Sequence, residues 1–355
     1  MKPIENGGPW LGPLGRDADV VVASRVRLAR NLAGFPFTNR ASTTQRREVV
    51  SMVRDRAQAA SWGRMLGWVD LQACPAEQRT QMVERHLVSK QFAASDAPRA
   101  VGISADETLS VMVNEEDHLR IQAMYSGLRI DECFAAATAF DRGAESALDF
   151  AWHHRWGYLT ACPTNVGCGI RVSVMLHLPA LRLTSELDRV RRAAKDLHLA
   201  LRGFHGEGSE PMGDFYQLSN QITLGMRDED VVGELRDRII PQVIRYERLA
   251  RETYRSKAPA AARDRFIRAA ALLTHSRLMQ LDEAMKLLGR LRLGIASGLT
   301  EAIDSTLVHR LLLQVQPAHL ALARPNDPME TLEQQSAARA TLLRDALAPL
   351  RASIG

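Results

Sequence analysis

Short apolar stretches alternate with glycine- and asparagine-bearing turns along the first two thirds of the chain. Runs of about four to eight β-branched and apolar residues, bounded by such turns, are typical of strands. The pattern therefore predicts strands mixed with helices, and its clearest strand-like stretches are residues 20–23, 109–113, 158–161 and 171–178.

The pattern becomes helical from Asp228 onward. Asp228 is suited to cap the start of a long helix, and Pro241 predicts a kink or break within it. Residues 258–263 are predicted to form a short connector, after which Leu, Ala and Arg recur at helical spacing from Asp264. Because 355 residues exceed the usual single core, we expect a mixed domain at 1–255 and a helical domain at 256–355.

Composition predicts a folded protein of the cytoplasm, since 46% of the residues are hydrophobic and 25% are charged. No apolar run approaches the roughly 18 residues that cross a bilayer, and the first ten residues lack the apolar core of a signal peptide. The net charge of +5 mildly favours acidic or phosphorylated partners, although a solvated helix surface explains it equally well, and no nucleic-acid partner is expected. The cysteines show no spacing typical of zinc and are expected to be free thiols: Cys74, Cys133, Cys162 and Cys168.

The densest chemistry lies at residues 114–120, which read NEEDHLR. This run follows a predicted buried strand at 108–113, so its charged side chains should lie at the end of a strand, where catalytic groups are often displayed. For Glu115 and Asp117 the alternative to a catalytic role is that they are solvated or pair with nearby arginines.

Two further segments combine glycines with reactive side chains. Residues 158–171 run from a strand into a turn that carries Cys162, with Gly167 and Gly169 allowing close backbone approach. Residues 201–214 form a glycine-rich loop that bears Glu207. Taken alone, a buried inert thiol and a flexible surface hairpin explain these two segments better than a site does.

A fourth segment, residues 23–30, alternates arginines with apolar residues. In strand conformation Arg25 and Arg27 point to the same face. The four segments occur in the order found in the phosphagen kinases, the ATP:guanidino phosphotransferases. The chain most closely resembles their bacterial branch, the protein arginine kinases, and residues 84–92, 164–181, 217–225 and 316–320 extend the similarity over nearly the whole chain.

The resemblance implies an α+β catalytic domain, with a twisted antiparallel sheet flanked by helices, followed by a smaller all-helical C-terminal domain. It implies transfer of the γ-phosphoryl of ATP to the guanidino group of arginine residues in proteins. Phosphagen kinases of small guanidines carry a helical domain before the segment that begins here at Ser24, and none is expected to fit before it. An acceptor site without that cover could admit an arginine on a protein surface.

The resemblance also implies the nucleotide site. The arginines that hold ATP phosphates match Arg25, Arg27, Arg120, Arg171 and Arg202, and arginine suits phosphate through its bidentate fork. Mg²⁺ is expected to be bound by ATP oxygens and water, since no protein cage is visible. The remaining residues expected at the nucleotide are Ser24, Val26, Leu28, His86, Val172, Ser173, Val174, Met175, Gly203, Phe204, His205, Gly206 and Glu207.

On the acceptor side, Glu116 matches the family's catalytic carboxylate, Glu207 its partner, and Cys162 its reactive cysteine. Carboxylates can orient a guanidinium and accept its proton, and Cys162 is expected to support the reaction without a covalent intermediate. Glu116 has an alternative role, which is to neutralise the arginine cluster. A kinase of a free guanidino metabolite and a non-catalytic scaffold are the alternative functions.

The resemblance implies partners besides protein substrates with exposed arginine: a zinc-binding activator protein, a chaperone-protease that degrades marked proteins in stress response, and a second copy of the chain.

One departure concerns the branch's RDxxRA motif, which forms a phosphoarginine pocket. Arg339 and Ala340 match its end, whereas Gln335 and Ser336 replace its leading Arg and Asp. We expect use of that pocket to be weakened or absent.

Overall fold

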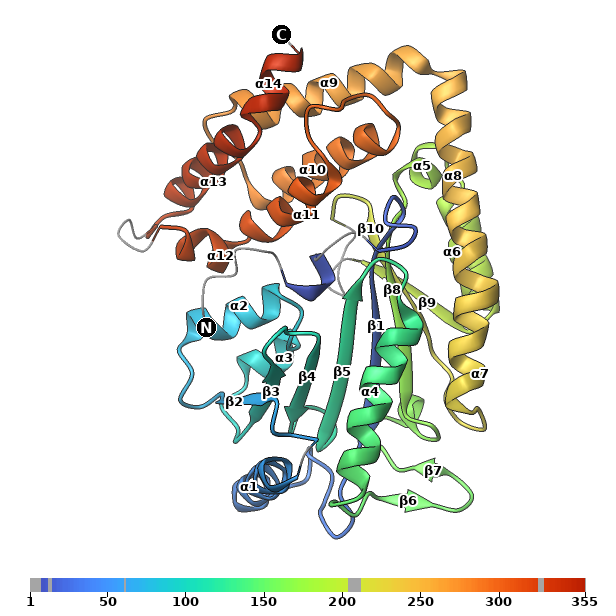
Figure 1. Cartoon of the computed structure of the whole chain (residues 1–355), viewed down its shortest axis with the longest axis vertical. Coiled ribbons are helices and arrows are strands. Elements are labelled where there is room, and N and C mark those ends of the chain that lie inside the picture. The colour runs from blue at the N-terminus through green and yellow to red at the C-terminus, as the bar shows by residue number, and fades with distance from the viewer. Residues whose placement is uncertain (1–7, 12–14, 61, 204–211, 325–328, 355) are drawn as a thin grey trace.

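An antiparallel sheet forms the centre of the molecule (Figure 1). The computed structural model describes residues 8–11, 15–60, 62–203, 212–324 and 329–354. Within them, eight strands pair in the order β2-β3-β4-β5-β1-β8-β10-β9. Their bounds are β1 Val21–Arg30, β2 Leu66–Asp70, β3 Ala100–Ser104, β4 Leu109–Val113, β5 Leu119–Ser126, β8 Ile170–His177, β9 Leu199–Gly203 and β10 Phe215–Asn220, and a separate hairpin pairs β6 Trp152–His153 with β7 Gly157–Tyr158.

Helices surround this sheet and then form a group of their own (Figure 1). Those packed around the sheet are α1 Thr43–Ala59, α2 Ala76–Glu84, α3 Lys90–Ala94, α4 Ile130–Glu145, α5 Pro179–Leu183, α6 Leu187–Asp196, α7 Asp228–Gly233, the π-helix η3 Glu234–Ile239 and α8 Ile240–Lys257. Those gathered beyond one end of the sheet are α9 Pro259–His275, α10 Leu281–Ala296, α11 Ser305–Gln314, α12 Pro317–Leu322, α13 Leu332–Ala346 and α14 Ala348–Ile354. Two single turns, η1 Pro9–Leu11 and η2 Pro163–Asn165, complete the helical elements of the described residues. The α+β fold class is confirmed.

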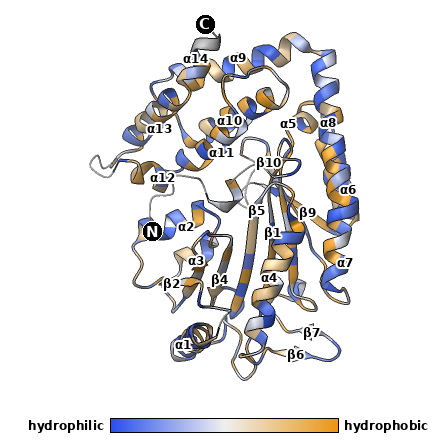
Figure 2. Cartoon of the chain, in the orientation of Figure 1, coloured by the Kyte–Doolittle hydropathy of each residue, from blue (hydrophilic) through white to orange (hydrophobic). Residues whose placement is uncertain are grey.

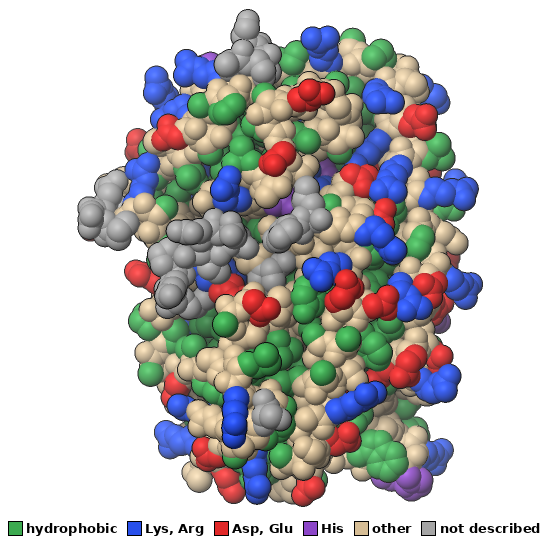
Figure 3. Space-filling view, viewed as in Figure 1, with side chains coloured by type: hydrophobic (Ala, Val, Ile, Leu, Met, Phe, Trp, Pro, Cys, Tyr) green, Lys and Arg blue, Asp and Glu red, His purple; other side chains and the backbone are tan. Residues whose placement is uncertain are grey.

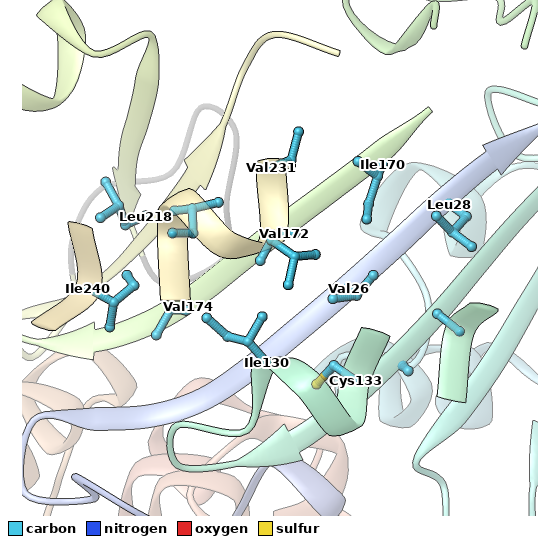
Figure 4. Close-up of a cluster of buried hydrophobic side chains, with 14 of the residues drawn as sticks. Val26, Leu28, Ile130, Cys133, Ile170, Val172, Val174, Leu218, Val231 and Ile240 are labelled. Atoms are coloured by element: carbon cyan, nitrogen blue, oxygen red, sulfur yellow. The ribbon is translucent and has the colours of Figure 1, made fainter. Parts of the chain in front are cut away.

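One face of the sheet is apolar because every second residue of the central strands is a β-branched or aliphatic residue. Val26, Val172 and Leu218 lie on this face, where side chains from α4, α7 and α8 cover them (Figure 4). Cys133 of α4 and Ile240 of α8 belong to the same buried cluster. The opposite face of the same strands carries the alternate residues, which are largely polar.

A second buried cluster joins the sheet to the C-terminal helices. It includes Met175 and Phe215 of the sheet, Trp10 of η1, and Phe266 and Leu288 of α9 and α10. The helices are amphipathic, as the alternating hydrophobic and hydrophilic patches on α8 and α9 show (Figure 2). None of the helices in the described ranges is long and apolar enough to span a membrane.

The predicted strand at 108–113 is confirmed as β4, whereas the predicted connector at 258–263 is wrong. Helix α8 ends at Lys257, and α9 begins two residues later with Pro259 in its first turn, where proline is tolerated. The alanine-rich residues continue as helix because alanine has the highest helix propensity.

The helix that begins with α7 also differs from its prediction. Its N-cap is Arg227, and Asp228 is the first helical residue. The predicted break at Pro241 is wrong, because the helix continues through this residue, whereas the alternative of a kink stays a prediction. The π-type turn η3 ends at Ile239, two residues before this proline. A π-type turn replaces the bonds between residues four apart that a proline ring would obstruct.

Charge on one face of the molecule is mixed in sign. On the face shown in Figure 3, lysine and arginine side chains are interspersed with aspartate and glutamate over the sheet and the C-terminal helices. This face therefore carries no extended field of a single sign.

Candidate active site

The polar face of the sheet brings arginines from neighbouring strands into one row. Arg27 of β1 pairs in register with Gln122 of β5 and with Arg171 of β8. Arg25 lies two residues away on the same face and donates from Nε to Ser173 Oγ at 3.2 Å. The expectation that Arg25 and Arg27 share a face is therefore confirmed.

A cavity of about 920 Å³ opens over this row of side chains. It extends from the hairpin between β4 and β5 to β9 at the edge of the sheet. The charged residues of its lining, among the described residues, are Arg25, Arg27, Lys90, Arg99, Glu115, Glu116, Arg120, Arg171 and Arg202.

Positive charge dominates the floor of this cavity. Burial lowers the pKa of Arg25 to about 10, and repulsion from Arg120 and Arg171 acts in the same direction. Burial, followed by repulsion from Arg25, Arg120 and Arg171, lowers the pKa of Arg27 well below its usual range. Arg27 Nε has no hydrogen-bond partner among the described residues. Cations held this close together without full compensation are suited to bind a polyanion.

The hairpin at residues 114–118 separates its two glutamates. Asn114 turns the chain with a positive φ of 63° and donates its backbone N–H to His118 O at 2.9 Å. Glu115 is buried, accepts from Ser89 Oγ at 2.7 Å and pairs with Arg120 at 2.9 Å. Glu116 also meets Arg120, at 3.1 Å, but 44% of its side chain remains exposed, and it lines the cavity.

The same two glutamates differ in electrostatics. Although burial alone would raise the pKa of Glu115, Arg120 and the hydrogen bond from Ser89 lower it. Burial raises the pKa of Glu116. Attraction to Arg120 lowers this pKa, and repulsion from Asp117 and Glu115 offsets part of that lowering. Glu115 is therefore committed to its ion pair, whereas Glu116 is the more readily protonated carboxylate of the cavity.

Asp117 and His118 stabilise this hairpin through hydrogen bonds to residues 31, 32 and 161. Asp117 Oδ1 accepts from Asn31 Nδ2 and from the Ala161 N–H, both at 2.7 Å, so it pairs with amides and not with an arginine. His118 Nδ1 accepts from the Leu32 N–H at 3.0 Å, which leaves Nε2 to donate to a carbonyl. Because Ala161 immediately precedes Cys162, Asp117 fixes the loop of Cys162 against the hairpin of Glu116.

Cys162 lines the same cavity as Glu116, and its Sγ lies 3.0 Å from Thr164 Oγ1. The turn after it needs glycines, as predicted. A Cβ on Gly167, whose φ is 113°, would lie 2.5 Å from Thr223 O, and a Cβ on Gly169 would lie 2.8 Å from Ala29 O. The turn is thus packed directly against the sheet, and Cys162 is held at its end.

Alkylation should distinguish Cys162 from the other cysteines. Burial raises the pKa of Cys133 to about 12 and that of Cys168 to about 11, and it also raises the pKa of Cys74. Since the thiolate is the reactive form, iodoacetamide at pH 8 should modify Cys162 first, as peptide mass spectrometry would show. Equal labelling of Cys133 in the folded protein would contradict this expectation.

The structure places some predicted nucleotide residues away from the cavity. Val26, Val172 and Val174 lie in the apolar core on the other face of the sheet, because side chains alternate along a strand. Ser24 Oγ donates to Gly127 O at 2.8 Å, and Met175 packs in the cluster shared with the C-terminal helices. These residues support the arginine strands, and their side chains do not reach the cavity.

Other predicted nucleotide residues border the cavity or lie outside the described residues. Leu28 contributes to the lining although its side chain belongs to the core, and His86 and Arg202 face the cavity. Gly203 is buried at the end of β9. The predictions for Phe204, His205, Gly206 and Glu207 fall outside the described residues.

Sequence reasoning did not identify several residues of the lining. Arg99 lies in the cavity and donates to the carbonyls of Gln91 and Phe92, at 3.0 and 3.2 Å. Gln122 adjoins Arg27 only through strand pairing. The i, i+2 spacing of Gln122 from Arg120 on one strand was a signal that could have indicated a shared face.

The donor set does not resemble a dedicated metal site. The described residues contain no group of three or more His, Cys, Asp or Glu side chains that could hold a metal ion. Glu115 and Glu116 are both engaged with Arg120. Such a cavity fits a cation that arrives on phosphate oxygens and keeps water ligands, as Mg²⁺ does.

Two family models together match most of the chain. Residues 48–250 match the model described as "ATP:guanido phosphotransferase, C-terminal catalytic domain". Residues 259–353 match the model described as "Protein-arginine kinase McsB C-terminal domain".

Known structures share the fold. The duplicated taurocyamine kinase from Schistosoma mansoni with bound transition state analog components has a TM-score of 0.59 and 25% identity, over 68% of this chain and 34% of that chain. Lombricine kinase has a TM-score of 0.57 over 69% of this chain and 72% of that chain, and at 24% identity it supports the fold alone.

Full-length similarity points to one branch. The protein-arginine kinase of Shouchella clausii is 39% identical over 342 residues, or 96% of this chain and 94% of that protein. The protein-arginine kinase of Moorella thermoacetica is 40% identical over 351 residues, or 97% and 99% of the two proteins. The chain is therefore a phosphotransferase that belongs to the ATP:guanido phosphotransferase family, in the branch of the protein-arginine kinases.

Proposed function

We propose that this protein transfers the γ-phosphoryl group of ATP to the guanidino group of arginine residues in other proteins. The observation that carries the proposal is the row of arginines on the polar face of the sheet, with Glu116 and Cys162 on the lining of the same cavity. A polyanion and a guanidinium would thus meet in one site.

In this proposal the arginine row holds the phosphates. Phosphoryl transfer passes through a loose transition state with charge spread over phosphate oxygens, so positioned cations supply most of the catalysis. Arg25, Arg27, Arg120, Arg171 and Arg202 have this role, and their planar forks suit bidentate contact with phosphate. Mg²⁺ would bind through ATP oxygens and supply further neutralisation of phosphate charge.

Glu116 has the acceptor role. A guanidinium stays protonated because its pKa is above about 12, so the attacking nitrogen must lose a proton when its bond to phosphorus forms. The Pγ–O bond breaks, ADP leaves, and the Glu116 carboxylate accepts the proton. Glu207 is proposed as the second carboxylate, and Cys162 as a contact for a non-reacting nitrogen.

The alternative role of Glu116 as a mere counter-charge is less economical. Glu115 already neutralises Arg120 from its buried side. A second, exposed carboxylate beside a phosphate site would repel ATP unless a cationic acceptor lay next to it.

One assay tests the function against its alternatives. The protein is incubated with labelled ATP and Mg²⁺, with either free arginine or an unfolded arginine-rich protein as acceptor. Acid-labile label on the protein acceptor is expected, because the P–N bond hydrolyses in acid. Faster labelling of free arginine would indicate a metabolite kinase, and no labelling of either acceptor would indicate a scaffold.

The wider setting is proposed from the family alone. It comprises a cytoplasmic location, marking of proteins for a chaperone-protease, a zinc-binding activator, self-association, and a domain boundary near residue 255.

Arg339 of α13 is buried and donates to Val315 O at 2.7 Å and to Met279 O at 2.9 Å. Since backbone carbonyls occupy this guanidinium, the arrangement supports a weakened phosphoarginine pocket.

A further inference from the structure

The C-terminal helices contact residues next to the cavity through a buried cluster of charged side chains. Glu84, the last residue of α2, accepts hydrogen bonds from the backbone N–H groups of Ala318 and His319, at 2.8 and 3.1 Å. Both groups lie in the first turn of α12. Glu84 is 6% exposed and His319 is 9% exposed, so this contact is shielded from water.

His319 joins two consecutive residues of the catalytic part of the chain. Arg85 Nε donates to His319 Nε2 at 3.0 Å, and His319 Nδ1 lies 2.5 Å from Glu84 Oε2. Because arginine can only donate, Nε2 is the acceptor and the ring proton on Nδ1 points to Glu84. Arg85, which is 1% exposed, is held from its other side by Glu107 at 2.9 Å.

The next residue along the chain, His86, faces the cavity in a strained conformation. Its φ of 58° lies in the left-handed region, which a residue with a side chain occupies only when its surroundings hold it there. Gln122 Nε2 donates to His86 O at 2.7 Å, and the Trp10 ring meets the imidazole edge to face at 4.7 Å. Gln122 also adjoins Arg27 in the strand register.

We propose that His319 is a positioning residue for the nucleotide site. It fixes Glu84 and Arg85 against α12, and these two residues hold His86 in its left-handed conformation at the edge of the arginine row. Nucleotide affinity then depends on the contact of α12 with Glu84 and Arg85, although no side chain of the described C-terminal helices lines the cavity. This inference rests on the proposed use of ATP.

A matched pair elsewhere in the interface provides a control. His309 of α11 also accepts from an arginine at 3.0 Å, through Nε2 from Arg292 Nε, and it is fully buried. Arg292 donates to the carbonyl oxygens of Ala18 and Asp19, so this pair also ties the C-terminal helices to the sheet domain. Its hydrogen bonds within the described residues lead to Ala18 and Asp19, which are distant along the chain from residues 84–86.

The experiment measures binding of the nonhydrolysable analogue AMP-PNP with Mg²⁺ to the full chain, together with the ATP KM, the kcat and the melting temperature. His319→Ala is expected to raise the Kd and the ATP KM roughly tenfold with a smaller change in kcat, a size typical of coupling between sites. His319→Gln offers an oxygen to Arg85 and should restore affinity. His309→Ala should lower the melting temperature without changing the Kd.

If His319→Ala does not fold, His319→Asn is the variant whose AMP-PNP affinity tests the inference. It keeps an N–H for Glu84 and removes the acceptor of Arg85, so it should still weaken AMP-PNP binding. Unchanged affinity in His319→Ala and His319→Asn, or equal weakening in His309→Ala, would overturn the inference. A wild-type protein that binds no AMP-PNP would overturn the proposed function itself, whereas wild-type binding with unaffected variants removes only the role of His319.

Discussion

Replacing Glu116 with glutamine should lower kcat for arginine phosphorylation by about 10²–10⁴-fold, the range that a positioned acid–base group contributes. Glutamine fills the same space but cannot accept the proton that the attacking nitrogen must lose. Affinity for AMP-PNP should stay the same or improve slightly, because a carboxylate near the phosphates is removed. Steady-state rates with labelled ATP and a separate binding titration measure the two effects.

Glu115→Gln is the matched control, since Glu115 is the adjacent residue and binds the same guanidinium. Its side chain is 7% exposed and is held by Ser89. Its loss should loosen Arg120 and therefore raise the ATP KM and lower the melting temperature. A Glu116→Gln enzyme that keeps wild-type kcat, or two variants with the same kinetic profile, would exclude the catalytic assignment.

The pH dependence of kcat/KM checks the same assignment. Burial raises the pKa of Glu116 in the free enzyme, and its acidic neighbours add to the effect. The carboxylate is the active form, so activity should fall as the pH drops through this raised pKa, at a higher pH than for an ordinary glutamate. The fall should disappear from the residual activity of Glu116→Gln.

Local spacing predicted those features that depend on neighbours along the chain. The alternation at 23–30 predicted a shared face for Arg25 and Arg27, and the apolar run before Asn114 predicted β4; the structure confirms both. The connector at 258–263 was wrong because a low-complexity alanine run is compatible with either linker or helix. Packing of α9 against α10 and α14 stabilises the helix, and no local signal contains that contact.

The site was predictable only in part, because strand order is not written in local sequence. Nothing near Arg27 indicates that Gln122 and Arg171 are its neighbours. Nor does the density of charge at 114–118 distinguish Glu116 from Asp117, which is buried against backbone amides. Tertiary contacts assign one carboxylate to the cavity and the other to the support of a loop.

The arginine row implies a conflict between stability and binding. Arg25 and Arg27 lie close to other cations, and the pKa values of both are lowered by burial and mutual repulsion. In the absence of an anion these charges oppose the folded state. A bound triphosphate reverses the sign of the interaction, so the ligand should raise the melting temperature by mass action.

Arg27→Gln should therefore have opposite effects on binding and on stability. Affinity for AMP-PNP should fall about 100-fold, because loss of a charged hydrogen-bonding group costs up to about 3 kcal/mol. The melting temperature of the free protein should rise by about 2 °C, since relief of roughly 1 kcal/mol of repulsion has that effect in a chain of this size. Calorimetry with and without AMP-PNP measures both quantities.

Arg54→Gln is the control for the change in net charge, because Arg54 is exposed on α1 and does not line the cavity. It should leave both the affinity and the melting temperature near their wild-type values. Inorganic triphosphate at one fixed concentration should stabilise the wild type and the Arg54 variant more than the Arg27 variant, because the anion acts through the arginine row. An Arg27→Gln protein that is less stable than wild type without ligand would show that Arg27 has a structural role and is not held in place for phosphate.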